Sequence, residues 1–434
     1  MAGGEWRKLR VEDFAEVIGG GTPSTKDETN FNGEIPWITP KDLSDYQFRY
    51  ISRGERNISE KGLNNSNAKL LPAGSVLLTT RAPVGYVVIA ANPLTTNQGF
   101  HSLVPKEGFS SEFIYYLLKA NTEYLKANAS GTTFSELSGQ VLKKLVFYLP
   151  PLHEQRAIAH ILGTLDDKIE LNQRMSQTLE AMARALFKAW FVDFEPVRAK
   201  CRGDLPGRPR WQRGESLPGL PAHLYDLFPD RLVDSELGEI PEGWEVETLG
   251  DYCINFDSKR VPLSGRDRAN RKGPFPYYGA AGVLDYVDDY LFDGIYLLVG
   301  EDGSVMREDG LGVTQYVWGK FWVNNHAHVL QGKPPVSTEQ LYFYFDFESV
   351  APHVTGAVQP KLSQGRMNTM PFLFAGEEVC LEFHRLVEPW FARIRACAEE
   401  SRTLAALRDT LLPKLISGEL WVGDAERFLK ERDL

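Results

Sequence analysis

The chain has 434 residues, of which 43% are hydrophobic and 24% are charged, and its formal net charge is −10. This length exceeds one ordinary core and predicts two domains with connecting elements, while the composition is that of a soluble globular protein. No apolar stretch is long enough to cross a bilayer and residues 1–10 lack the layout of a signal peptide, so we expect a cytoplasmic protein with no membrane partner. The negative charge argues only mildly against nucleic-acid binding, because phosphate contacts depend on where the basic side chains lie.

The first predicted element in chain order is a strand-rich globule over residues 1–150. Its short apolar runs, such as SVLLTT at 75–80 and GYVVIA at 85–90, are separated by glycine, proline and asparagine, a pattern typical of strands and turns. A long helix is predicted to follow the globule. The remaining elements are predicted in this order: the first long helix over 151–195, a linker rich in proline, glycine and arginine over 196–237, a second strand-rich globule over 238–374, a second long helix over 375–420, and a tail over 421–434.

The two halves of the chain are related by an internal duplication. Trp6 has a counterpart in Trp244, 238 residues later, and Asn97 has one in Asn324, 227 residues later. From Gly131 onward the offset stays at 225 through the predicted helix. The loops of the globules therefore differ in length between the halves, whereas the helices do not.

Both predicted helices carry a seam of apolar or small residues spaced alternately three and four apart. This spacing is held for more than four heptads and predicts a coiled coil, in which each helix covers the apolar seam of the other. The alternative is that each amphipathic helix packs on its own domain. Polar seam residues are expected to fix the register, and Pro389 is expected to kink the second helix or to mark its start. The seams are Ile158, Leu162, Leu165, Ile169, Asn172, Ser176, Leu179, Ala183, Leu186 and Trp190, and Phe383, Val387, Trp390, Ile394, Cys397, Ser401, Leu404, Arg408, Leu411 and Leu415.

Four separated motifs resemble the specificity subunits of type I restriction-modification systems, and the resemblance covers essentially the whole chain. They are LPPLHEQ at 149–155, LFKAWFVDFEP at 186–196, DSELGEIPEGW at 234–244 and LLPKLISGEL at 411–420. The second half departs from the pattern at 375–378, where AGEE stands in place of the PPLHEQ run, so the start of the second helix is less certain.

The resemblance implies an α/β (α+β) fold with two target recognition domains in a pseudo-twofold arrangement, separated by an antiparallel coiled coil. Each domain would read one part of a bipartite site in double-stranded DNA. It also implies two methyltransferase subunits and further endonuclease/translocase subunits as partners. The chain itself would have no cofactor, because S-adenosylmethionine, ATP and Mg²⁺ would be bound by the partners. A helix of roughly 40 residues is on the order of 60 Å long, which suits a spacer between two readers.

In the first half, polar and glycine-containing loops supply the residue types that contact phosphates and base edges. The GGGTPS run at 19–24 lets the backbone approach a phosphate, although it fits an ordinary turn equally well. Arginine suits guanine, and asparagine or glutamine suits adenine. The candidate DNA-binding residues are Thr22, Ser24, Thr39, Lys41, Thr80, Arg81, Asn97, Gln98, Thr132 and Thr133.

In the second half, six basic residues stand close together with a single acidic residue, Asp267, among them. Such a cluster would neutralise several phosphates and make DNA binding salt-dependent, whereas the alternative is a solvated surface loop. Further candidates are polar residues in later loops. The full set is Lys259, Arg260, Arg266, Arg268, Arg271, Lys272, Tyr278, Asn324, Asn325, His326, Gln359 and Lys361.

No catalytic constellation is visible in the sequence. The two Pro-Pro pairs, at 150–151 and 334–335, lack the flanking residues of an adenine methyltransferase motif, and no phosphate-binding Gly-Lys-Ser or Gly-Lys-Thr loop is present. The four cysteines have no paired spacing, and His326 with His328 has no companion ligands nearby, so we expect no metal. We therefore predict a non-catalytic reader; a coiled-coil scaffold and a degenerate remnant of a fused methyltransferase are the alternatives.

Overall fold

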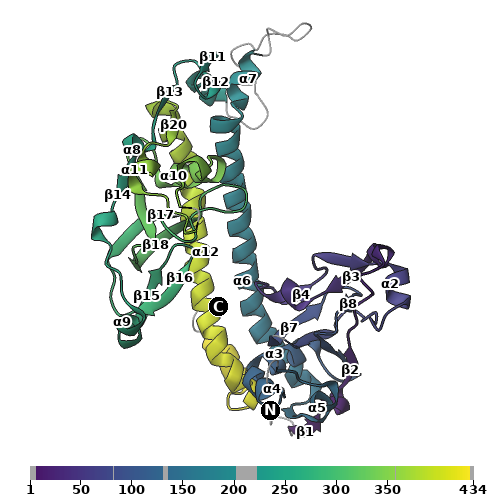
Figure 1. Cartoon of the computed structure of the whole chain (residues 1–434). Helices are drawn as coiled ribbons and strands as arrows, with labels where there is room; N and C mark the ends of the chain where they lie inside the picture. Colours follow the sequence, from purple (N-terminus) through teal and green to yellow (C-terminus); the bar gives the residue numbers. More distant parts are fainter. Residues whose placement is uncertain (1–5, 82, 131–134, 202–221, 357, 431–434) are drawn as a thin grey trace. The chain divides into compact units, whose positions relative to one another are not determined.

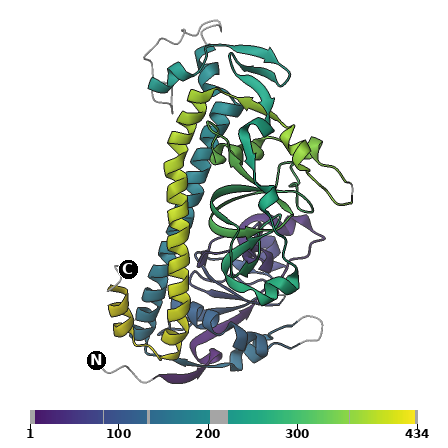
Figure 2. The ribbon, with the colours of Figure 1, turned by 90° about the vertical axis from the view of Figure 1, so that its left-hand side faces the viewer.

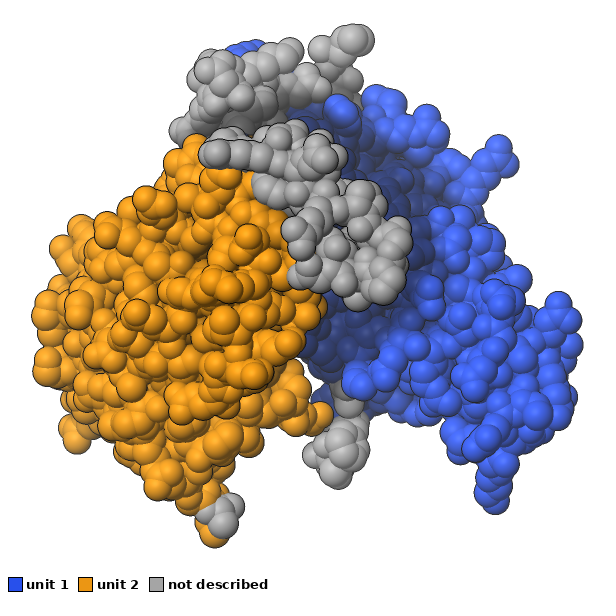
Figure 3. Space-filling model, turned by 90° about the horizontal axis from the view of Figure 1, so that it is seen from above, with its two compact units in different colours: residues 1–174, 398–434 blue, residues 175–397 orange. Residues whose placement is uncertain are grey.

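The computed structural model describes residues 6–81, 83–130, 135–201, 222–356 and 358–430 (Figure 1). The chain forms two compact units, shown in different colours in Figure 3. Unit 1 comprises residues 1–174 and 398–434, and unit 2 comprises residues 175–397. No helix in the described residues is both long and apolar enough to span a membrane.

Unit 1 is built on a five-stranded sheet with the order β2-β9-β6-β7-β4 and a three-stranded sheet with the order β5-β3-β8. Strands β1 and β10 form a separate antiparallel pair, with Arg7 opposite Leu149. The strands are β1 (Arg7–Arg10), β2 (Ala15–Gly19), β3 (Phe31–Ile38), β4 (Tyr50–Ile51), β5 (Arg56–Ile58), β6 (Val76–Thr80), β7 (Val84–Ala90), β8 (Thr95–Thr96), β9 (His101–Pro105) and β10 (Val146–Leu149). The short helices are α1 (Val11–Phe14), α2 (Glu60–Asn64), α3 (Ser111–Ala120), α4 (Thr122–Ala127) and α5 (Gly139–Lys144).

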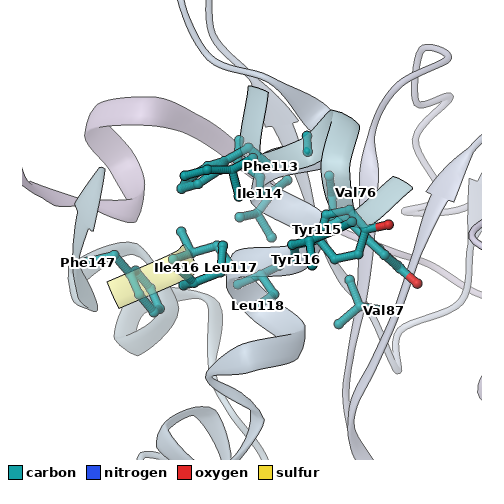
Figure 4. Close-up of a cluster of buried hydrophobic side chains, with 14 of the residues drawn as sticks. Val76, Val87, Phe113, Ile114, Tyr115, Tyr116, Leu117, Leu118, Phe147 and Ile416 are labelled. Carbon is teal, nitrogen blue, oxygen red and sulfur yellow. The ribbon is translucent and has the colours of Figure 1, made fainter. Parts of the chain in front are cut away.

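The central strand of the five-stranded sheet, β6, is buried on both faces. Along β6, Val76 and Leu78 join the cluster around helix α3, whereas Leu77 between them joins a second cluster on the opposite face. All three side chains are fully buried, as the two-residue period of a strand covered on both sides requires. Figure 4 shows Phe113 and Tyr116 of α3 with Val76 and Val87 in the first of these clusters.

Unit 2 has a six-stranded sheet with the order β14-β19-β17-β18-β15-β16, and β13 pairs antiparallel with β20. Its strands are β11 (Leu232–Ser235), β12 (Gly238–Pro241), β13 (Glu245–Thr248), β14 (Cys253–Asn255), β15 (Lys272–Tyr278), β16 (Val283–Val287), β17 (Phe292–Gly300), β18 (Thr314–Val323), β19 (Ala327–Gly332) and β20 (Pro371–Phe374). Its short helices are α7 (Glu195–Cys201), α8 (Leu249–Tyr252), α9 (Gly265–Asn270), α10 (Thr338–Phe347) and α11 (Gln364–Asn368).

Two long helices, α6 (Leu152–Phe187) and α12 (Glu377–Ser417), pass through both units and lie side by side within each (Figures 1 and 2). In unit 1, Asp166 pairs with Arg408, and Asn172, further along α6, pairs with the earlier residue Ser401. In unit 2, the rings of Phe187 and Phe383 pack edge-to-face. Since contacts advance along one helix as they retreat along the other, the helices are antiparallel, which confirms the predicted pairing over the separate packing of each helix.

The boundaries of the long helices preserve the duplication offset. The first helical residue of α12, Glu377, lies 225 positions after Leu152, the first residue of α6. A π-helical segment, Lys188–Val192, continues α6, and its last residue lies 225 positions before Ser417. Gly376, with a φ of +86°, precedes α12 where the first half has proline. The AGEE departure therefore does not move the start of the second helix.

Three parts of the chain differ from the sequence expectation. Helix α12 begins twelve positions before Pro389 and continues past it, so Pro389 does not mark the start of the helix. The predicted linker contains α7 and the strand β11 in its described parts. The predicted tail contains helix α13 (Val422–Lys430), which forms because Val422 and Ala425 pack on the unit 1 core.

Candidate nucleic-acid interface

In unit 1, four loops gather at one end of the five-stranded sheet. The loop after β2 is joined to the β8–β9 loop by hydrogen bonds from Gly20 N to Phe100 O, 3.2 Å, and from Gly21 N to Thr96 O, 2.9 Å. A Cβ at Gly20 would lie 2.0 Å from the carbonyl oxygen of Asn97, so only glycine permits this approach. The loop after β6 is joined by Thr80 N to Gly99 O, 2.7 Å.

The fourth loop begins at Ser130 and returns to the sheet at Glu136. Ser130 and Glu136 exchange two backbone hydrogen bonds of 2.9 Å, and Leu137 N then donates to Thr80 O at 3.0 Å. Thr132 and Thr133, which the sequence suggested as DNA contacts, lie outside the described residues. Backbone hydrogen bonds thus join the first three loops and the two described ends of the fourth, even though these segments come from distant parts of the sequence.

Several predicted side chains meet on this surface. The Thr22 hydroxyl donates to Gln98 Oε1, and both residues are exposed. Arg81 is 48% exposed and forms a 2.7 Å ion pair with Glu136. Asn97 Oδ1 accepts a 2.8 Å hydrogen bond from Gly99 N, which fixes the direction of its amide.

The other first-half candidates are placed differently. Thr80 is fully buried and its hydroxyl bonds the His101 ring at 2.8 Å, so its side chain is not accessible to DNA. Thr39 caps a short turn through Asp42, and Lys41 pairs with Glu55 at 2.9 Å. Ser24 is exposed in the loop after β2.

Unit 2 repeats this loop arrangement. Glu301 N donates to His326 O at 2.8 Å, as Thr80 N does to Gly99 O, and Leu362 N donates to Glu301 O at 2.8 Å. Thr355 and Lys361 exchange backbone hydrogen bonds of 2.8 and 2.7 Å. The structure therefore brings together the loops that carry Asn324, Asn325, His326, Gln359 and Lys361.

The loops of unit 2 are held by a network of charged side chains. Arg260 bonds Glu301 at 2.7 Å and the carbonyl oxygen of Ala327 at 2.6 Å, and Lys361 pairs with the other oxygen of Glu301 at 3.1 Å. The buried His328 ring lies between Asp257, at 2.5 Å, and the carbonyl oxygen of Leu362, at 2.8 Å. The Arg260 side chain is only 12% exposed and is enclosed by these loops, whereas the Lys361 side chain is 49% exposed.

The network determines the ionisation of its carboxylates. Burial would raise the pKa of Asp257, but the hydrogen bond from His328 and the nearby Arg260 hold that pKa below its usual range. The pKa of Glu301 is lowered in the same way, against the effect of burial, mainly by Arg260 and His328. Both groups are therefore anionic near neutral pH.

Ligand atoms of Asp257, Glu301 and His328 lie within 4.8 Å of one another, a spacing that a metal ion can bridge. Arg260 pairs with both carboxylates, at 3.4 Å and 2.7 Å, and Lys361 adds a second cation to Glu301. A metal ion would have to displace these cations. The arrangement fits a charge-balanced clamp between loops better than a metal centre.

Most of the basic cluster in residues 259–272 is paired with acidic side chains from elsewhere in the sheet. Lys272 and Arg268 pair with Asp285, at 2.5 and 3.5 Å. Arg271 pairs with Asp288 at 2.9 Å and stacks on Trp322. Among the described residues Arg266 has no ion pair, and Lys259 lies over the Phe256 ring.

The acidic partners Asp285 and Asp288 lie in and just after strand β16, which pairs with β15. A search of the basic segment alone misses them, because they lie 13 or more positions further along the chain. The segment is consequently much less positive than its own composition suggests.

A cavity of about 480 Å³ lies beside the unit 2 loops. The tip of the β15–β16 hairpin, including Ala281 and Leu284, lines one part of it, and Asp302, Asn324, His326 and Gln359 line another. Asn324 is only 5% exposed, and its Oδ1 accepts from His326 N at 2.8 Å. Tyr278, the last residue of β15 before the hairpin turn, packs edge-on against Phe321.

Sequence reasoning overlooked Glu136, Glu301 and Asp302, because acidic residues were not considered as members of a DNA-facing surface. The duplication contained the signal. Applying the offset of 225 to Lys361 identifies Glu136. Arg81 forms a β-bridge with Glu136 and Asp302 forms one with Lys361, so Arg81 and Asp302 occupy equivalent positions.

The fold, with an equivalent loop surface in each of its two units, defines a two-domain DNA reader of the type I restriction-modification class. The model of the type I restriction modification DNA specificity domain matches residues 3–181 and 241–373, and the chain belongs to this family. It is accordingly a specificity subunit, and neither the scaffold nor the methyltransferase remnant is favoured.

Relatives support this assignment along the whole chain. The type I restriction enzyme MjaIX specificity subunit of Methanocaldococcus jannaschii is 36% identical over 96% of this chain and 94% of its own length. The HindI specificity subunit of Haemophilus influenzae is 26% identical over 96% of this chain and all of its own. The crystal structure of a type I system S subunit from M. genitalium has the same fold, with a TM-score of 0.54 at 16% identity over 95% of this chain and 96% of that one.

Proposed function

We propose that this chain supplies the DNA-sequence specificity of a type I restriction-modification enzyme by binding a bipartite site in duplex DNA. Residues 1–150 and 238–374 would act as the two target recognition domains, and the helical segments at 151–195 and 375–420 as spacers. The observation that carries the proposal is the repeated loop surface, because one chain with two equivalent surfaces suits a target with two parts.

The chain would contribute no chemistry of its own. Methyltransferase subunits, two per chain, would bind S-adenosylmethionine and modify the DNA, and endonuclease/translocase subunits would use ATP and Mg²⁺. Membership of the specificity family supports this division. The complex would act in the cytoplasm, where its DNA target lies.

The proposed interface consists of the candidate residues that are exposed or partly exposed on the gathered loops, together with Lys259 and Arg266 of the basic segment. Gln98 and Arg81 would contact base edges in the first domain, and His326 and Gln359 would do so in the second, because all four have accessible polar side chains. Arg266 and Lys259 are suited to phosphates. The proposed set is Thr22, Ser24, Arg81, Asn97, Gln98, Lys259, Arg266, Asn325, His326, Gln359 and Lys361, and the buried Asn324 does not belong to it.

The test is to map adenine methylation in DNA from cells that express this chain with its methyltransferase subunit. We expect a gapped two-part motif that is absent when the methyltransferase subunit is expressed alone. Replacing residues 1–150 with the corresponding segment of a relative should change one part of the motif and leave the other part intact. Unchanged methylation, together with failure of the purified complex to bind duplex DNA, would refute the proposal.

A further inference from the structure

The loop surfaces of the two units share one backbone frame, defined here by equivalent hydrogen bonds. Asn97 N donates to Ile38 O at 3.0 Å, and its counterpart Asn324 donates to Tyr278 O at 3.1 Å. Each asparagine also accepts a 2.8 Å hydrogen bond at Oδ1 from the N–H two residues later. The bonds at Thr80 and Glu301 repeat in the same way, with Gly99 and His326 as acceptors.

One position on this shared frame carries opposite charges in the two units. Arg81 in unit 1 and Asp302 in unit 2 each follow the residue that makes those bonds. Each also forms the equivalent β-bridge, Arg81 with Glu136 and Asp302 with Lys361. The backbone is therefore matched at this position, whereas an exposed donor has been exchanged for an acceptor.

Both side chains keep accessible surface, but that of Asp302 is smaller, because its side chain is only 16% exposed. The Arg81 guanidinium is 48% exposed and uses one side to pair with Glu136. Asp302 accepts from the His326 ring through Oδ1, and it lines the 480 Å³ cavity with Asn324 and Gln359. His326 is itself 47% exposed, so the Asp302–His326 pair offers an acceptor and a ring nitrogen at the rim of one cavity.

Two domains that share one backbone frame and recognise different sequences must differ where they contact bases. Residues that they share suit the phosphate backbone, which is common to every sequence. Guanine presents two acceptors in the major groove and suits an arginine, whereas cytosine and adenine present an amino group that suits a carboxylate. We propose that the position of Arg81 and Asp302 determines specificity in each domain, with Arg81 recognising a guanine and Asp302 recognising an exocyclic amino group of cytosine or adenine.

This inference rests on the proposed function and is tested in the complex with the methyltransferase subunit. Arg81→Gln should relax or change one base in one part of the methylated motif, and Asp302→Asn should do so in the other part only. The loss of discrimination at that base should be about tenfold to a hundredfold, the range for one good base contact. Discrimination is measured by the affinity of each complex for duplexes that carry every single-base substitution of the wild-type motif.

Two control variants remove the same charges as the test variants, but at positions outside the shared backbone frame. Arg10→Gln removes an exposed arginine that pairs with Glu12 in unit 1. Asp293→Asn removes an exposed acid near the start of β17, whereas Asp302 follows the end of that strand. Complexes that contain either control variant should methylate the wild-type motif.

The outcomes separate this inference from the proposed function. If the wild-type complex yields no two-part motif, the proposed function fails. If it does, but both variants retain the motif with full stringency, only the inference is overturned. An equal loss of affinity for all the duplexes would also overturn it, because that result assigns Arg81 and Asp302 to loop structure or phosphate binding.

Discussion

Asp166 illustrates how single polar residues stabilise the helix pair in unit 1. Its carboxylate accepts hydrogen bonds from Arg408, at 2.6 Å, and from the Tyr116 hydroxyl, also at 2.6 Å. Arg49 in turn donates to that hydroxyl at 3.1 Å, which links the helices to the recognition globule. Arg408 occupies a seam position, so its charge is accepted there because Asp166 faces it.

We predict that Asp166→Asn destabilises the protein by about 2 kcal/mol, because it leaves the largely enclosed Arg408 with a weaker partner. Asp409 also pairs with Arg408 but is 63% exposed, so Asp409→Asn should change stability by less than about 0.5 kcal/mol. Urea unfolding of the full chain, followed by circular dichroism, measures both. Equal effects of the two variants would show that the position of Asp166 between the helices is unimportant.

Pro389 shows how an element tolerates a residue that its sequence disfavours. Within helix α12 the proline has no N–H to donate to the carbonyl of Arg385 one turn earlier. The seam residues Phe383 and Val387, together with Phe391, are buried in the unit 2 core, and this packing holds the helix together across the missing bond. Packing therefore outweighs helix propensity at this point.

We predict that Pro389→Ala raises the free energy of unfolding by about 1–2 kcal/mol. Alanine restores a helical hydrogen bond, which stabilises the folded chain. Part of this gain is lost because alanine also raises the conformational entropy of the unfolded chain. Pro389 is exposed, so little packing is lost. Arg385→Ala, at a side chain 62% exposed in the same turn, is the control and should change stability by less than about 0.5 kcal/mol. Denaturant unfolding that found no gain for Pro389→Ala would contradict this account of the helix.

At the scale of the whole molecule, the balance of charge depends on pairing more than on composition. The net charge is −10, and within the basic segment Arg260, Arg268, Arg271 and Lys272 have carboxylate partners. Few cations are left to neutralise phosphates, so the contribution of this segment to the salt dependence of DNA binding should be small.

We predict that Arg266→Ala lowers the slope of log affinity against log salt concentration by about one, the value for one lost phosphate contact. Lys272→Ala should lower it much less, because Asp285 already neutralises this side chain. Binding of the assembled complex to its target duplex, measured between about 50 and 200 mM salt, gives both slopes. A larger effect for Lys272→Ala would show that its ion pair opens on DNA.

The sequence by itself determined the duplication, the two long helices with their seam, and the family. These features depend on local periodicity and on motifs that are contiguous in the chain, so they can be recognised from the sequence alone. Only the tertiary structure decided which candidate side chains are available to contact DNA. Thr80 is enclosed by the sheet, and Arg271 is neutralised by Asp288. Arg81 and Asp302 occupy equivalent positions because each forms the same β-bridge within its own unit, with Glu136 and Lys361. Burial and ion pairing are long-range properties, and local composition does not encode them.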